Sequence, residues 1–415
     1  MTARAVSYSS PSHLAKLNDV AAVRERCAMV HRWVADGRSR HFALDESRLG
    51  AVAAYVADVT REAYPDLKIP CHSRWRHFSA GGVDRWGALA ARNDADRFER
   101  ARMAVDLATV SVLLDAGAGD RWGYRDRASG LSFARSEGLA VASFDMFRAG
   151  AFSADPARPW RVDSIALANI DAATLARHFQ VDTENPLIGL DARSALLRRL
   201  GKALAARADL FPREGARPGN LVDYCRNVAR EGRIPAASLL AALLDGLSSI
   251  WPSALIVGGC PIGDAGRHPA VRTDDATDGI VPFHKLSQWL AYSLIEPLEA
   301  AGLAVERLHE LTALAEYRNG GLLVDLGVIR PRAAIDPLLR HDVGSQLVVE
   351  WRALTVALMD PLVGLVRERL GLNSSFTMPQ LLQGGTWSAG RKIAHALRPP
   401  DGPPPIAVAA DGTVF

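Results

Sequence analysis

The chain has few cysteines for its length, and their spacing argues against two kinds of cysteine-based architecture. Its 415 residues contain four cysteines, Cys27, Cys71, Cys225 and Cys260, which lie far apart and form no CxxC pair. Structural zinc sites and disulfide frameworks need cysteines at characteristic, closely spaced positions. We therefore expect reduced thiols, no metal site and no disulfide scaffold.

Long apolar runs and a strong excess of one charge are also missing. The longest apolar stretch, from Ile234 to Val257, is interrupted by Asp245 and Pro252, so it predicts a buried helix rather than a membrane span. The formal net charge of +3 gives no electrostatic reason to expect nucleic acid as a partner. Residues 1–17 carry no signal-peptide pattern. These absences predict a cytoplasmic protein that binds neither nucleic acid nor membrane.

What the sequence does have is helical spacing of apolar residues. Apolar positions recur on one face within 49–59, 196–204 and 286–294, whereas alternating patterns are few. Short strands are expected only within Trp160–Ile170 and Ile406–Val408. The predicted fold is therefore mainly α, a helical bundle with few short strands.

Breaks rich in glycine and proline divide this helical pattern. They predict an N-terminal helical subdomain over residues 1–155, a second helical domain over 156–397, and a C-terminal tail over 398–415 that packs on the body. The oligomeric state stays open.

The segment Leu311–Gly327 (LTALAEYRNGGLLVDLG) is the most informative stretch. Its apolar residues predict a helix that ends at Asn319-Gly320-Gly321, which would put Glu316 in the last turn. The helix dipole disfavours a carboxylate there, so Glu316 needs a reason to occupy the position. The more frequent reason is an ion pair with an arginine such as Arg318, and the alternative is an acid–base or charge-stabilising role.

A second segment, Asp278–Leu294, places His284 and Lys285 in the first turn of an amphipathic helix. A lysine at a helix start gains nothing from the dipole, so Lys285 either faces an anion or is simply solvated. In the third segment, Ile69–Trp86, histidines and arginines alternate with aromatic residues. It predicts either an oxyanion site or a basic loop over an aromatic core.

The remaining segments match no established catalytic or nucleotide-binding motif. Asp115 and Trp122 lie in a glycine-containing stretch, 113–126, that fails the P-loop and dinucleotide patterns, and 258–266 lacks the Walker A lysine. The sequence also lacks GxSxG and HExxH. We therefore expect no nucleotide or other cofactor. The segment 381–394 reads as a structured loop that enters a helix, either a ligand lid or ordinary packing.

Taken in order, these segments resemble a known family. The succession CHSRWRHF, DRWGYRD, IVPFHKLSQWL, LAEYRNGGLLVDLGV, LLQGGTWSAGRKIA and DGTVF is similar to the URC-type uracil-catabolism family over nearly the whole chain. That family was long catalogued as a domain of unknown function.

A more distant resemblance, over about 165–362, is to the queuosine-nucleoside glycosylases of queuine salvage. Phe283, Lys285 and Gln288 match a PFxKxxQ-like helix start, and Ala315–Arg318 matches an A-D-Y-R segment. Glu350 and Arg352 match an E-x-R element. The resemblance implies an all-helical fold related to DNA glycosylases, in which an aspartate acts at the ribosyl carbon. Glu316 stands in place of that aspartate, one methylene longer.

The two resemblances together imply hydrolysis of a ribosylurea, or of its 5′-phosphate, through an oxocarbenium-like sugar. Glu316 would stabilise the cationic sugar and activate water. The proton of the leaving nitrogen would come from Asp115, Asp278 or His284. The expected substrate contacts are stacking by Trp122 or Tyr317, phosphate binding by Lys285 with Arg74 or Arg76, and further contacts from His72, Arg318 and Arg352.

Two other functions remain open at this point. A metal-assisted amidohydrolase or ring-opening enzyme would draw its ligands from Asp264, His268, Asp274 and Asp275. A non-catalytic protein of the pathway would leave Glu316 exposed to bulk water, away from any cavity.

Overall fold

The computed structural model describes residues 12–212, 215–253, 255–336 and 338–409. The N-terminal residues 1–11, to which part of the signal-peptide expectation refers, and the DGTVF end at 411–415 lie outside the described residues. Most of the described chain is helical, so the predicted mainly α class is confirmed, while the likeness to glycosylases stays a prediction. No helix among the described residues is long and apolar enough to cross a bilayer.

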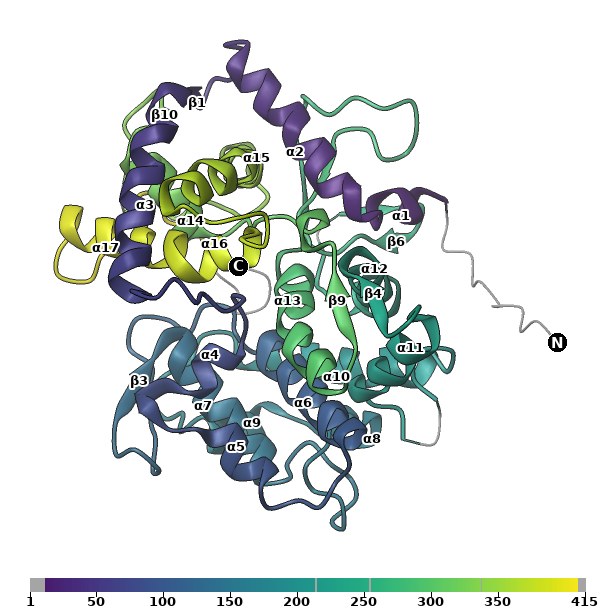
Figure 1. The fold of residues 1–415 in the computed structure, drawn as a ribbon. Coiled ribbons are helices and arrows are strands. Elements are labelled where there is room, and N and C mark those ends of the chain that lie inside the picture. The colour runs from purple at the N-terminus through teal and green to yellow at the C-terminus, as the bar shows by residue number, and fades with distance from the viewer. Residues whose placement is uncertain (1–11, 213–214, 254, 337, 410–415) are drawn as a thin grey trace.

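The two ends of the chain pack together in one layer, seen in purple and yellow in Figure 1. There α15 contacts α2, α3 and α14, and α14 contacts α17. The helices of this terminal layer are α1 (Ser12–Leu17), α2 (Val20–Ala35), α3 (Leu49–Ala63), α14 (Tyr317–Asp325), α15 (Gln346–Leu370), α16 (Met378–Leu381) and α17 (Trp387–Leu397), with a π-helical turn, η6 (Leu382–Thr386), between the last two.

The middle of the chain forms the second layer, drawn in blue and teal in Figure 1. Helix α6 contacts α7, α10 and α11 there, α7 contacts α4 and α9, and α10 contacts α8. Its helices are α4 (Trp75–Phe78), α5 (Arg85–Ala90), α6 (Arg97–Leu113), α7 (Arg135–Arg148), α8 (Ser164–Asn169), α9 (Ala172–His178), α10 (Leu190–Ala206), α11 (Leu221–Val228) and α12 (Ala236–Leu247).

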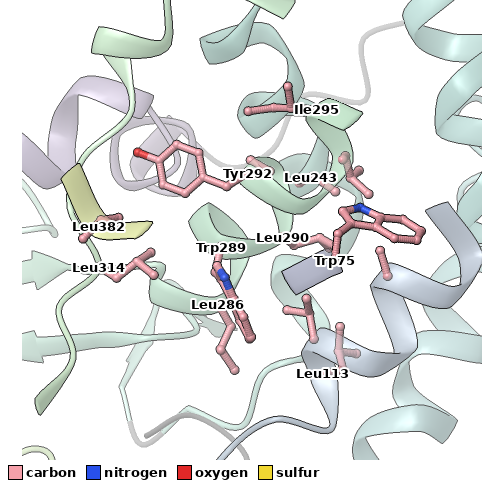
Figure 2. Packing of buried hydrophobic residues seen from close by; sticks show 14 of the residues in the cluster. Trp75, Leu113, Leu243, Leu286, Trp289, Leu290, Tyr292, Ile295, Leu314 and Leu382 are labelled. Carbon is pink, nitrogen blue, oxygen red and sulfur yellow. The ribbon is translucent and has the colours of Figure 1, made fainter. Parts of the chain in front are cut away.

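Helix α13 (Lys285–Ala300) runs through the centre and packs against α6 and α12. Most residues of α13 are buried, including the whole run Leu286–Ile295, as is typical of a helix inside a core. Figure 2 shows its apolar side chains directed to different neighbours, among them Leu286, Trp289, Leu290, Tyr292 and Ile295. A buried helix of this kind gives the residues at its first turn a fixed position.

The described strands are short and pair two by two. Four pairs are antiparallel: β1 (Phe42–Leu44) with β10 (Ile329–Pro331), β2 (Gly123–Arg125) with β3 (Ser132–Ala134), β5 (Ile256–Val257) with β6 (Cys260–Pro261), and β7 (Ala265–Arg267) with β8 (Ile280–Pro282). The pair β4 (Arg233–Pro235) with β9 (Ala304–Glu306) is parallel.

Two local expectations are wrong. The strand expected within Trp160–Ile170 is instead α8, because the Asp163 side chain accepts the amides of Ile165 and Ala166 and so caps a helix. The helix expected before Glu316 is absent from this described stretch: 312–316 has no regular structure, and α14 begins after Glu316.

The predicted division near residue 155 stays a prediction. Helices from both sides of that position pack together, α6 with α10 and α7 with α9. The tail, as far as residue 409, lies against the body and bonds back to it: the amide of His341 donates to Ala407 O at 2.8 Å, and the amide of Ala409 donates to His341 O at 2.9 Å.

Candidate active site

A cavity of about 720 Å³ lies where the two layers and the tail meet. Helices α7, α13 and α14 all begin on its wall. Amides at the starts of α13 and α14 already donate to protein carboxylates, whereas the start of α7 has no side-chain cap. The predicted site residues on its wall are His72, Asp115, Lys285, Glu316, Tyr317 and Arg318.

Glu316 caps α14 rather than ending a helix. Its Oε2 accepts the amide of Arg318 and its Oε1 accepts the amide of Asn319, each at 2.8 Å. Burial raises the pKa of Glu316 above its ordinary 4.5, although these amides and Lys285 oppose the shift. The carboxylate is thus held in one orientation on the cavity wall, and not in bulk water as the non-catalytic alternative required.

The dipole argument from the sequence is therefore reversed. A carboxylate at a helix start is favoured by the dipole, whereas the sequence pattern had suggested the disfavoured end. The reason is that Asn319-Gly320-Gly321 lies inside α14 instead of ending a helix. A Cβ on Gly320 would come within 2.7 Å of Trp351 Nε1, so the glycine serves close packing of α14 on α15.

Asp115 provides a second carboxylate on the wall. It accepts from Arg74 Nη1, and Ser136 Oγ lies 2.6 Å from Oδ1 and 2.7 Å from Oδ2. Burial raises the pKa of Asp115, against the effect of Arg74. Lys285 lines the same cavity as both carboxylates, and its positive charge lowers the pKa of Asp115 and of Glu316. Burial in turn lowers the pKa of Lys285.

Arg74 and Arg76 do not line the cavity formed by the described residues. Arg74 is fully buried and holds Asp115, with a further bond from Nε to Ser111 Oγ at 2.7 Å. Arg76 pairs with Glu296. Neither is therefore placed to hold a phosphate in this cavity, as the sequence had suggested.

Arg352 and His284 lie behind the wall. Arg352 donates from Nη1 and Nη2 to the two oxygens of Asp264 at 2.8 and 2.9 Å, and from Nε to the Ala315 carbonyl at 3.2 Å. Asp264 in turn accepts the amide of Lys285 at 3.0 Å. This ion pair thereby fixes the backbone beside both Lys285 and Glu316. His284 Nε2 lies 3.0 Å from the Leu17 carbonyl.

Trp122 and Asp278 also lie away from this cavity of the described chain. Trp122 is in the core, where its Nε1 donates to the Phe179 carbonyl at 3.0 Å. Asp278 lies in the connection between β7 and β8 and pairs with Arg272 at 3.3 Å. Neither is positioned for the stacking or proton transfer that the sequence suggested.

The Asp-rich segment does not assemble a metal-ligand set. Asp264 pairs with Arg352, His268 with Glu350, and Asp275 with Lys16. Across the described ranges no group of three or more histidine, cysteine, aspartate or glutamate side chains is arranged to hold a metal. The ligand source required by the amidohydrolase alternative is therefore not brought together.

Several wall residues carry no recognisable sequence signal. Arg135, Ser136 and Glu137 open α7 without any motif, and they reach the wall only because α7 packs against α4 and α6. The tail 398–408 also contributes, held by Arg398, whose Nη1 and Nη2 bond Asp325 at 2.9 and 2.6 Å. Further wall residues are His77, Trp289, Trp387 and Arg391, which the sequence did not assign to a substrate.

Comparison with known proteins places the chain in a family. A family model described as "Protein of unknown function (DUF1688)" matches residues 16–415. The chain belongs to this family. It is 36% identical over 432 aligned positions to "Uracil catabolism protein 4" of Lachancea kluyveri, covering 95% of this chain and 97% of the relative. It is 37% identical over 416 positions to "Protein urg3" of Schizosaccharomyces pombe, covering 98% and 100%.

The family resemblance that the motifs predicted is thereby confirmed. The second resemblance, to queuosine-nucleoside glycosylases, stays a prediction. The family model matches residues 16–415, so the residues that line the cavity all fall within the matched range.

Proposed function

We propose that this protein acts in uracil breakdown by hydrolysing the N-glycosidic bond of a ribosylurea or of its 5′-phosphate, which yields urea and ribose or ribose phosphate. The relative named "Uracil catabolism protein 4" supports the pathway. The observation that carries the reaction is Glu316, a carboxylate fixed by two backbone amides on the wall of a cavity that also holds Asp115 and Lys285.

The chemistry asks for a fixed anion beside the sugar. As the C1–N bond breaks, its electron pair leaves with nitrogen and positive charge builds on C1 and the ring oxygen. Glu316 stabilises this charge and accepts a proton from the water that attacks C1. Because its orientation is already set by the α14 amides, little reorganisation is needed at the transition state.

The leaving nitrogen needs one proton to become the second amino group of urea. Asp115, whose pKa is raised by burial, supplies it, with Ser136 and Arg74 holding the carboxyl in place. Lys285 lines the same cavity, and its positive charge lowers the pKa of both carboxyl groups. The balance is one water consumed, its oxygen on C1 and its proton passed by way of the carboxylates to nitrogen.

The test is the product set. Purified protein is incubated with ribosylurea and with its 5′-phosphate, and urea and ammonia are both measured, with Glu316→Gln as the matched control. We expect urea without ammonia from the wild type. Ammonia and carbon dioxide would indicate cleavage of the ureide amide instead, and no urea above the Glu316→Gln control would contradict the proposal.

A further inference from the structure

Three ring side chains form an uncharged part of the cavity wall. His72, His77 and Trp289 all line the cavity and are only 7%, 9% and 5% exposed. The His72 and Trp289 rings are stacked, with centroids 6.0 Å apart, and the His77 ring meets Trp289 edge-on at 5.9 Å. Burial lowers the pKa of His72 to about 4 and that of His77 well below its ordinary 6.5, so both imidazoles are neutral near pH 7.

The hydrogen bonds of His72 fix which of its nitrogens carries the proton. Nδ1 lies 3.1 Å from Gln383 Oε1, and the Gln383 amide nitrogen donates to Tyr64 Oη at 2.9 Å. With the Gln383 side chain in this orientation, its amide oxygen can only accept, so His72 Nδ1 donates to it. In a neutral imidazole the other nitrogen is then an acceptor. Nε2 of His72 therefore presents a lone pair, and no partner for it is found in the described part of the chain.

The support for this arrangement is rigid. Gln383 lies in the π-helical turn η6, a geometry that often marks functional sites. The turn is pressed against α3, since a Cβ on Gly385 would come within 2.4 Å of Val56 Cγ1. The backbone of His72 is fixed as well, because its amide donates to the Pro379 carbonyl at 3.0 Å.

We propose that His72, His77 and Trp289 form the subsite for the leaving group, and that this group is a neutral, planar ureide whose terminal N–H donates to His72 Nε2. The inference rests on the proposed function and deepens it by assigning the leaving-group end of the substrate. A lone-pair acceptor repels phosphate and carboxylate oxygens, which have no hydrogen to donate. A cationic group finds no carboxylate among these three side chains, and the guanidinium carbon of Arg74 lies 5.4 Å from the Trp289 ring centroid.

The test is a binding preference measured without turnover. The probe is carbocyclic ribosylurea, in which CH₂ replaces the ring oxygen so that the C–N bond does not break, in 5′-hydroxyl and 5′-phosphate forms. Its partner carries two methyl groups on the terminal nitrogen and has no N–H there. Calorimetric titration of the full chain should give the unmethylated probe an advantage of about tenfold or more, the size of one good hydrogen bond to a buried acceptor.

Two variants separate recognition from folding. His72→Phe should abolish the preference, and His72→Gln, which offers an amide oxygen near the Nε2 position, should restore part of it. Gln383 does not line the cavity among the described residues, and its side chain bonds Tyr64 and His72, of which only His72 is on the wall, so Gln383→Glu reaches the ligand through His72. Its carboxylate would raise the pKa of His72, protonate Nε2 and remove the preference while leaving the cavity shape intact.

Each outcome bears on one claim. An equal affinity of both probes for the wild type, or no binding of either, overturns the subsite, as does an equal loss for both probes in His72→Phe. A preference that depends on His72 without release of urea from ribosylurea would leave the subsite standing and contradict the proposed hydrolysis. Release of urea without the binding preference would support the proposed hydrolysis and contradict the leaving-group subsite.

Discussion

Asp264 and Glu316 occupy similar local positions but have different partners. Each carboxylate accepts a backbone amide at a helix start, Asp264 at α13 and Glu316 at α14. Arg352 bonds both oxygens of Asp264. Burial raises the pKa of that carboxyl, but Arg352 and Lys285 together bring it below its ordinary value. Glu316 is held by amides, has a raised pKa and borders the cavity. Asp264, paired at both oxygens with an arginine, anchors the fold. Glu316, held by backbone amides beside a cavity, is available for chemistry.

The largest expected effect is on turnover by Glu316→Gln. The amide keeps the shape and one capping oxygen but removes the charge that faces the cationic sugar. We expect kcat/KM to fall by roughly 10³-fold, the scale seen when a main electrostatic stabiliser is removed. The thermal midpoint should stay close to that of the wild type. If Glu316→Gln keeps more than a tenth of wild-type kcat/KM, the carboxylate of Glu316 is structural, like that of Asp264, and does not act in the reaction.

Next in size is the loss of stability in Arg352→Met. Asp264, only 7% exposed, would be left as an unpaired buried charge. Removing one partner of a buried pair costs about 3–5 kcal/mol, which denaturant unfolding measures directly. The double variant Arg352→Met/Asp264→Leu should regain most of this loss. A single variant as stable as the wild type would show that the pair does not anchor α13.

The pH profile of kcat/KM should reflect the two carboxyl groups of the proposed mechanism, Glu316 as the base and Asp115 as the acid. Glu316 must be ionised, and its folded pKa lies above 4.5, so activity should fall about tenfold per unit as pH drops below that raised value. Asp115 must carry the proton that it gives to the leaving nitrogen, and burial holds its pKa above 3.8, so activity should also fall as pH rises through that raised value. An acid limb at or below 4.5 would contradict the raised pKa of Glu316.

The smallest effect is expected at Asp278. Its carboxylate is 36% exposed, pairs with Arg272 and accepts the amide of Thr273 at 2.8 Å, away from the cavity. Asp278→Asn should leave turnover within about twofold of the wild type and change the free energy of unfolding by no more than about 0.5 kcal/mol. A large loss of kcat would return Asp278 to the catalytic set in which the sequence had placed it.

The sequence predicts the helices better than it predicts the site. Apolar spacing locates α3, α10 and α13, because a helix that is buried on one or more faces has apolar residues at intervals of three and four positions. The same spacing misleads at Leu311–Ala315, where the residues are buried in extended chain rather than on a helix. Burial alone does not distinguish the two conformations over so short a run.

The site itself depends on tertiary packing that no local pattern records. The sequence singled out Glu316 and Lys285 because each charge lies where the helix dipole does not favour it. Both residues do line the cavity, although the helix beside Glu316 follows it instead of preceding it. Ser136 and Glu137 have no such signal, and Arg74 and Asp115 are 41 positions apart in the chain yet form one ion pair. Which arginine pairs with which acid is decided by how α4, α6 and α7 pack.

The central claim is that Glu316 faces a cation, and ligand charge tests it most directly. A cationic iminoribitol copies the charged sugar of the transition state, and a tetrahydrofuran of the same shape is neutral. The account predicts that the wild type binds the cation at least about tenfold more tightly than the neutral ring, and that Glu316→Gln loses this preference. An equal preference for the cation in both proteins, or none in the wild type, would contradict it.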